Sequence, residues 1–143
     1  LMTLGKTRAA LEEAITDEVL AAHPKVKIIY DNTAFTIPSK TVEYVIITVS
    51  FGQATQQNQG AATAFYSGFV QCDVYVPKNK GTARLSAISE SVITGMTSVN
   101  ESTYVDTYSC SPRTLDVVGP GPIDSDDESH FLGVISCQFS ANT

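Results

Sequence analysis

The sequence predicts a single α+β domain over residues 1–143, with two helices packed on a mostly antiparallel, twisted β-sheet. Three observations support this prediction: a helix-like N-terminal segment, a second amphipathic helix at about 82–99, and several segments that alternate as β-strands do. The 143 residues are 43% hydrophobic and 17% charged, which is sufficient for one continuous core.

The first helix is expected to run from Thr3, a suitable N-cap, to Ala22. Its apolar residues recur at helical spacing on one side: Leu4, Leu11, Ile15 and Val19. Pro24 ends this helix because proline disfavours the α conformation of the residue before it. His23 is therefore interpreted as a helix terminus and not as a catalytic base.

A short strand is expected at 26–30 and a longer one at 42–51. The longer strand is apolar on both faces, with Val45, Ile47, Val49 and Phe51 on one and Tyr44 and Ile46 on the other. Such a strand should be covered by a helix on one side and by further protein on the other, from the same chain or from a neighbour.

Residues 52–64 separate this strand from the next one, which is expected at 66–76 and ends before Pro77. The segment contains no charge, no large apolar residue and two glycines, so we expect a mobile loop when the subunit is alone. Loops of this length tend to be either functional or disordered.

The clearest helix is expected at 82–99, where a stripe of apolar residues recurs at steps of three and four. The stripe consists of Leu85, Ile88, Val92, Met96 and Val99. Three further strands are predicted after it: 103–109, 114–118 and 130–140. The Gly-Pro-Gly-Pro segment at 119–122 predicts a turn before an acidic tip at 124–128.

The net charge of −6 belongs to the last third of the chain. Basic and acidic residues balance at eight each through residue 99, whereas residues 100–143 contain seven acidic residues and Arg113 alone. An acidic surface repels phosphate, so tight nucleic-acid binding is disfavoured. A short acidic run can also be a solvated loop tip with no further role.

The three cysteines show no pattern of a disulfide framework or a zinc site, because their number is odd and no CxxC pair occurs. Cys72 and Cys137 alternate in phase with apolar strand residues. We therefore expect reduced, buried thiols with structural roles.

No catalytic, cofactor or metal site is predicted. The chain lacks GxxxxGK[ST], GxSxG and HExxH, and His23 and His130 do not have metal-ligand spacing. The glycines at 119–123 do not suit a phosphate loop, because the prolines between them lack N–H donors. The acidic run at 124–128 lacks the glycine and the bidentate glutamate of an EF-hand, although weak cation binding stays open.

The longest apolar runs are only a few residues, far below the roughly 20 of a transmembrane helix, so a soluble protein is expected. The first residues carry charge early and lack the apolar core of a secretory signal. We expect the protein to stay in the compartment where it is made.

The order of these features resembles the tail terminator proteins of long-tailed bacteriophages, including the lambda-type terminator, over nearly the whole chain. The segments that carry the resemblance are Ile-Ile-Tyr-Asp-Asn-Thr-Ala-Phe from Ile28, Glu-Tyr-Val-Ile-Ile-Thr-Val from Glu43, the polar loop, Gly-Phe-Val-Gln-Cys-Asp-Val-Tyr-Val-Pro from Gly68, and Lys-Gly-Thr-Ala from Lys80. Residues 119–130 do not match this pattern.

The resemblance implies a virion structural protein without enzymatic activity. Such a protein forms a homo-hexameric ring on the head-proximal end of the tail tube, stops tube growth and offers a docking surface for the head or neck. It implies the tail tube protein and a neck or head completion protein as partners, with no cofactor and no membrane, and assembly in the host cytoplasm.

Two surfaces are candidates for such contacts. An interface with a neighbouring subunit or the tube is expected at the polar loop, with Gln53, Gln56, Gln57, Asn58 and Gln59. A pore-lining or partner-facing surface is expected at Asp124, Asp126, Asp127 and Glu128, where like charge would let DNA slide without binding.

Three alternatives stay open from the sequence. Another head-to-tail joining or minor tail protein would share most of these features. A peptide-binding module would add a strand to an exposed sheet edge. A metal-dependent enzyme would use His130 with the acidic residues near it in sequence.

Overall fold

The computed structural model describes residues 4–30, 42–56, 64–77, 83–99, 113–123 and 130–142. These residues form two helices and five strands: α1 (Leu4–Ala22), β1 (Lys27–Tyr30), β2 (Tyr44–Gln56), β3 (Ala64–Pro77), α2 (Ala83–Ser98), β4 (Arg113–Ile123) and β5 (His130–Asn142). The strands make one sheet in the order β1-β2-β3-β5-β4. β1 is parallel to β2 and the other neighbours are antiparallel, which confirms the predicted α+β class.

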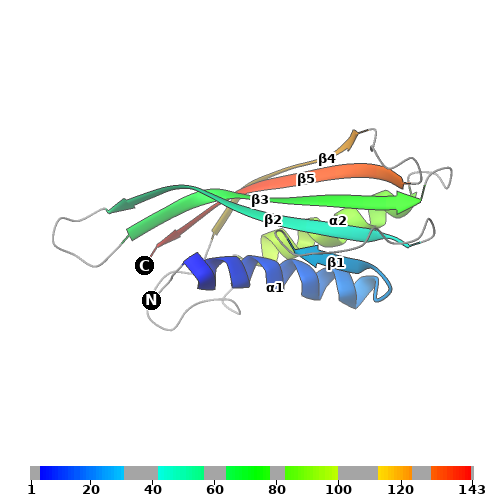
Figure 1. Ribbon diagram of the computed structural model, residues 1–143, viewed down its shortest axis with the longest axis horizontal. Helices are drawn as coiled ribbons and strands as arrows, with labels where there is room; N and C mark the ends of the chain where they lie inside the picture. The colour runs from blue at the N-terminus through cyan, green and yellow to red at the C-terminus, as the bar shows by residue number, and fades with distance from the viewer. Residues whose placement is uncertain are drawn as a thin grey trace.

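Both helices lie on the same face of the sheet (Figure 1). They are antiparallel to each other, since the end of α1 at His23 contacts the start of α2 at Arg84 and Ala87. The core lies between the helices and this face, and its strand residues are Val45, Ile47, Val49, Val70, Cys72, Val74, Ile135, Cys137 and Phe139. Alternate residues of three neighbouring strands therefore supply the floor of the core.

The predicted helix boundaries and apolar stripes are confirmed. The stripe of α2 is buried at all five positions, from Leu85 to Val99, with at most 4% of each residue exposed. Leu11, Ile15 and Val19 of α1 have no exposed surface. His23 follows the last residue of α1, and its backbone N–H donates to the carbonyl of Val19 at 2.7 Å.

The prediction of a loop over the whole of 52–64 is wrong at both ends. β2 continues through Gln56, and Gln53–Gln56 pair with Ala64–Ser67 of β3 after a register shift at Phe51/Gln53. Backbone pairing across a sheet does not require side chains that can be buried. β3 is held on its other side by β5, where Phe65 pairs with Asn142, so the ladder extends beyond the apolar residues of β2.

The predicted turn at 119–122 is also wrong, because these residues continue β4 to Ile123. Gly121 pairs with Val134 and Pro122 with Gly133 of β5. Gly119 has a φ of 118° where the register shifts between Val118 and Gly121, a conformation that favours glycine. β4 ends the strand order, and an edge strand tolerates prolines that a central strand would not.

The other predicted strand boundaries agree with the structure within a few residues, and β5 confirms the strand expected at 130–140. The strand expected at 103–109 lies outside the described residues, as does Cys110.

Replacement of Gly95 by alanine should destabilise the fold. A Cβ at this position would lie 2.7 Å from Ile15 Cα and 3.0 Å from the Ala14 carbonyl oxygen, so α1 and α2 would have to separate. We expect the free energy of unfolding, measured by urea denaturation, to fall by about 1–3 kcal/mol. The control is Gly121→Ala, where nothing lies within 4 Å of the added Cβ. Equal stability of the two variants would contradict the close helix contact.

Candidate interaction surfaces

The sheet face opposite the helices carries no described helix (Figure 1). Tyr44 and His130 lie on this face but are buried. Strand alternation also places there a set of partly or fully exposed residues: Ile46, Thr48, Ser50, Phe69, Gln71, Asp73, Tyr75, Val118, Leu132, Val134, Ser136 and Gln138. We call this set the open face. The helix on one side of the strand expected at 42–51 is confirmed, whereas the described residues place no second layer on its other side.

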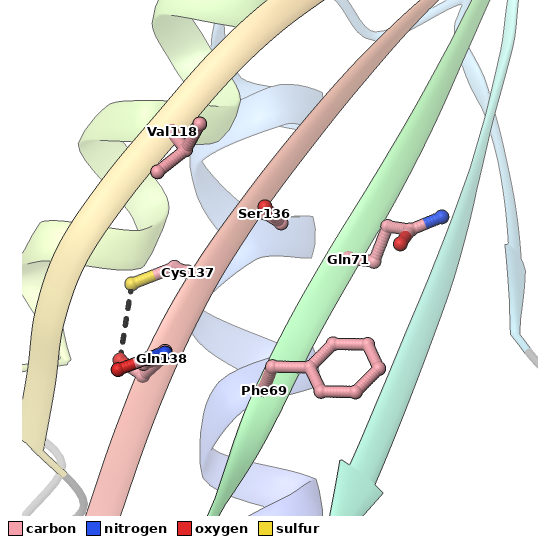
Figure 2. A pocket seen from close by; sticks show the side chains of 6 residues that line it. All are labelled: Phe69, Gln71, Val118, Ser136, Cys137 and Gln138. Carbon is pink, nitrogen blue, oxygen red and sulfur yellow. Dashed lines mark hydrogen bonds between the residues drawn. The ribbon is translucent and has the colours of Figure 1, made fainter.

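A hollow of about 420 Å³ lies on the open face and is shared by β3, β5 and β4. Figure 2 shows its lining residues: Phe69, Gln71, Val118, Ser136, Cys137 and Gln138. Phe69 is 43% exposed and Val118 is 65% exposed, which makes them unusually accessible for large apolar residues. The lining contains no charged residue, so the hollow offers apolar walls and neutral hydrogen-bonding groups.

Asp73 lies beside this hollow on β3. Its register neighbours are Ile46 on β2 and Val134 on β5, so the carboxylate is flanked by apolar side chains. The Nε2 amide of Gln71 donates to Asp73 Oδ1 at 3.0 Å. Partial burial raises the pKa of the Asp73 carboxyl, and the Gln71 hydrogen bond opposes this effect. No cationic side chain of the described residues pairs with Asp73.

His130 has a structural environment. Its side chain is fully buried, and its Nε2 lies 2.8 Å from the carbonyl oxygen of Val42. The ring meets that of Tyr44 edge-on, with 5.1 Å between centroids, and Tyr44 stacks on Tyr75. A histidine without exposed surface is not placed to exchange protons with a bound substrate. The acidic residues of the enzyme alternative lie outside the described residues.

His23 belongs to a polar cluster that joins three elements. The Nε of Arg84 donates to both carboxylate oxygens of Glu43, at 2.9 and 2.7 Å, and its Nη1 lies 2.9 Å from His23 Nδ1. A guanidinium can only donate, so Nδ1 must accept this hydrogen bond. The cluster ties the end of α1 to the starts of β2 and α2, which agrees with a structural role for His23.

Cys72 and Cys137 are buried and unbridged, as predicted. Burial raises the pKa of the Cys72 thiol, which disfavours the reactive thiolate. The Cys137 thiol lies 3.3 Å from the Gln138 carbonyl oxygen, to which it donates (Figure 2). Among the described residues, no group of three or more His, Cys, Asp or Glu side chains could hold a metal ion.

The structure describes only some of the predicted interface residues. Gln53 and Gln56 lie in the last part of β2, where they pair with Ser67 and Ala64 of β3. The remaining predicted interface residues are outside the described residues: Gln57, Asn58, Gln59, Asp124, Asp126, Asp127 and Glu128. The hollow and Asp73 were not predicted as a site. The sequence signal that could have indicated the hollow is the alternation of the uncharged polar residues Gln71, Ser136 and Gln138 with buried residues.

In the part of the chain that the structure describes, no helix has the length and apolar character needed to cross a membrane.

No protein-family model matches the chain, and no curated protein shows significant sequence similarity to it. Solved structures do show the same fold. A chain from the virion of the native gene transfer agent particle has a TM-score of 0.57 at 15% identity, over 95% of this chain and 96% of that chain. This chain therefore shares its fold with a virion chain.

Two further solved structures are similar. A protein whose name states no function has a TM-score of 0.70 at 20% identity, with 99% of this chain and 96% of that chain covered. The gp17 protein of bacteriophage SPP1 has a TM-score of 0.47 at 17% identity, with coverages of 96% and 91%. At these identities the first of the two supports the fold over nearly the full length of both chains.

Replacement of Asp73 by asparagine should stabilise the isolated subunit at neutral pH. Because burial raises the folded-state pKa of Asp73, the folded state binds the proton more tightly than the unfolded state. Wild-type stability should therefore fall as pH rises from about 3.9, the ordinary aspartate value, through the raised pKa. With solvent screening, we expect a gain of roughly 1 kcal/mol or less in Asp73→Asn at pH 7.

The measurement is urea denaturation of both proteins over a series of pH values. The difference in the free energy of unfolding between the wild type and Asp73→Asn should vanish below the unfolded-state pKa of aspartate. There the Asp73 carboxyl is protonated and is neutral, like the asparagine amide. Gln71→Leu removes a hydrogen bond that favours the Asp73 carboxylate. It should therefore enlarge the decrease in the free energy of unfolding between acidic and neutral pH. A lower stability of Asp73→Asn at pH 7 would show that burial does not dominate at this position.

Proposed function

We propose that this chain is a structural protein of a phage or phage-like virion that acts at the junction of head and tail. In the specific form of the proposal it is a tail terminator, a hexameric ring that caps the head-proximal end of the tail tube, stops tube growth and receives the head or neck. The fold shared over 95% of the chain with a gene transfer agent virion chain is the observation that carries this proposal.

The sequence resemblance to tail terminators supports the same class by a separate route. It depends on the order of segments along the chain, whereas the structural similarity depends on their arrangement in space. Both extend over nearly the whole chain. A different head-to-tail joining protein is the nearest rival, since low-identity similarity of fold does not separate members of this class.

A ring requires two different complementary surfaces on each subunit, because head-to-tail contacts close only when the rotation between neighbours permits it. The extended β2–β3 hairpin is one candidate, with the uncharged residues 52–64 directed to a neighbour or to the tail tube protein. The acidic residues 124–128 are proposed to face the pore or the neck protein, where repulsion keeps passing DNA from binding.

The deciding experiment is electron microscopy of particles from a phage that carries an early stop codon in this gene. We expect tails of uncontrolled length beside tailless, DNA-filled heads, because tube growth would lack its stop and heads would lack their docking surface. A plasmid-borne wild-type gene should restore normal particles.

Two other outcomes are informative. Tails of normal length that fail to attach would assign the protein to a joining role without length control. Normal particles would remove it from virion assembly and overturn the proposal.

Neutralisation of the acidic run should slow DNA ejection while leaving ring assembly intact. The variant changes Asp124, Asp126 and Asp127 to Asn and Glu128 to Gln, and ejection is followed by DNA release from purified particles. The matched control removes four carboxylates from the helices: Glu13→Gln, Asp17→Asn, Glu18→Gln and Glu90→Gln. An ejection rate equal to that of the wild type would contradict the pore-lining role.

A further inference from the structure

The hollow on the open face and the carboxylate beside it form a site with one sign of charge. Gln71 lines the hollow and also donates to Asp73, so the two are contiguous. Phe69 and Val118 supply exposed apolar walls on either side. A surface that carries cationic side chains with apolar stems has the matching chemistry, because its charge can meet the carboxylate while its apolar groups cover the hollow beside it.

The chain itself presents such side chains at the corner between α1 and β1. Lys25 and Lys27 flank the buried Val26, and both are exposed. Neither forms an ion pair with a described carboxylate, whereas Arg84 is paired with Glu43 and Arg8 with Glu12. We call Pro24–Lys27 the lysine corner.

The lysine corner lies at the β1 edge of the sheet, whereas the hollow lies on the open face, from the central strand β3 to β4. Lys27 is the first residue of β1, which begins the strand order. A contact between these two patches therefore joins the edge of one subunit to the open face of the next. This is the head-to-tail geometry that a closed ring needs.

From this arrangement we infer that the lysine corner of one copy docks into the hollow beside Asp73 of a second copy. Lys25 or Lys27 brings its ammonium group to Asp73, and the rest of the lysine corner covers the hollow beside it. The inference rests on the proposed function, since it specifies the two surfaces that join neighbouring subunits in the ring.

Desolvation explains why a charged pair would be placed on an otherwise neutral surface. In the isolated subunit Asp73 is half-buried between apolar neighbours, and among the described residues its partner is the amide of Gln71. The contact supplies a positive charge next to Asp73. It therefore offsets the desolvation free energy that the carboxylate already costs the isolated subunit. Charge complementarity also selects the register between copies and disfavours wrong contacts.

The test is self-association of the purified full chain, measured by analytical ultracentrifugation over its whole soluble concentration range. The variants are Asp73→Lys, the pair Lys25→Glu with Lys27→Glu, and their combination. Each reversal should raise the concentration needed for association by about tenfold or more, because like charges then face each other. The combined variant again places opposite charges in contact, so the concentration needed for association should return most of the way to the wild-type value.

The matched control is Asp17→Lys, which makes the same charge change at an exposed position of α1 that belongs to neither patch. It should associate as the wild type does. Circular dichroism identifies any variant that does not fold.

A second measurement requires no variant. A carbodiimide joins a carboxylate and an amine that are in contact, so it should link Asp73 to Lys25 or Lys27. Mixing isotope-labelled and unlabelled chains lets mass spectrometry distinguish links between copies from links within one copy. We expect the link between copies.

The outcomes separate this inference from the proposed function. If the chain associates but the reversed variants match the wild type and no link forms, the ring uses other surfaces and the inference is wrong. If the chain stays monomeric and no link forms, the inference is also wrong. In both cases the stop-codon experiment still decides the role in the virion.

Discussion

Burial of a single face of the sheet by two antiparallel helices is the constraint on which the rest of the structure depends. The helices fit together there because Gly95 lets α2 approach the backbone of α1 at Ile15. Every second residue in the central part of β2, β3 and β5 then belongs to the core. Since side chains alternate along a strand, the residues between them must lie on the opposite face. Burial of the helix-covered face thus produces the stable domain, while the opposite face, which is buried at one end around Tyr44 and His130, supplies the surface on which contacts are proposed.

The features that depend on near neighbours in sequence were predictable. The apolar stripe of α2 follows from the helical period, and the end of α1 at Ala22 follows from Pro24. The alternation that placed Cys72 and Cys137 in the core needs only the strand period. These signals define elements and their inner faces, which is sufficient for the fold class and for most of the core.

The errors have a common physical cause, which is pairing between segments distant in sequence. The polar end of β2 forms a strand because β3 pairs with it, and β3 is itself held by β5 near Asn142. The Gly-Pro segment extends instead of turning because β5 pairs with Gly121 and Pro122. The hollow requires the register of three strands at once, so the presence of Val118 and Phe69 in one lining has no local signal.

The proposed ring contact would make assembly self-limiting. In the proposed ring, a subunit that has filled its hollow still presents its lysine corner at the β1 edge, so a chain of copies would keep growing until the last corner meets the first hollow. Closure leaves neither patch exposed. In the proposed ring, the surfaces at the two ends of the axis would take no part in these lateral contacts, so they would stay available for the proposed partners, the tail tube and the neck. Lateral closure and axial docking can then be set by different residues, which lets a ring stop tube growth without also stacking on itself.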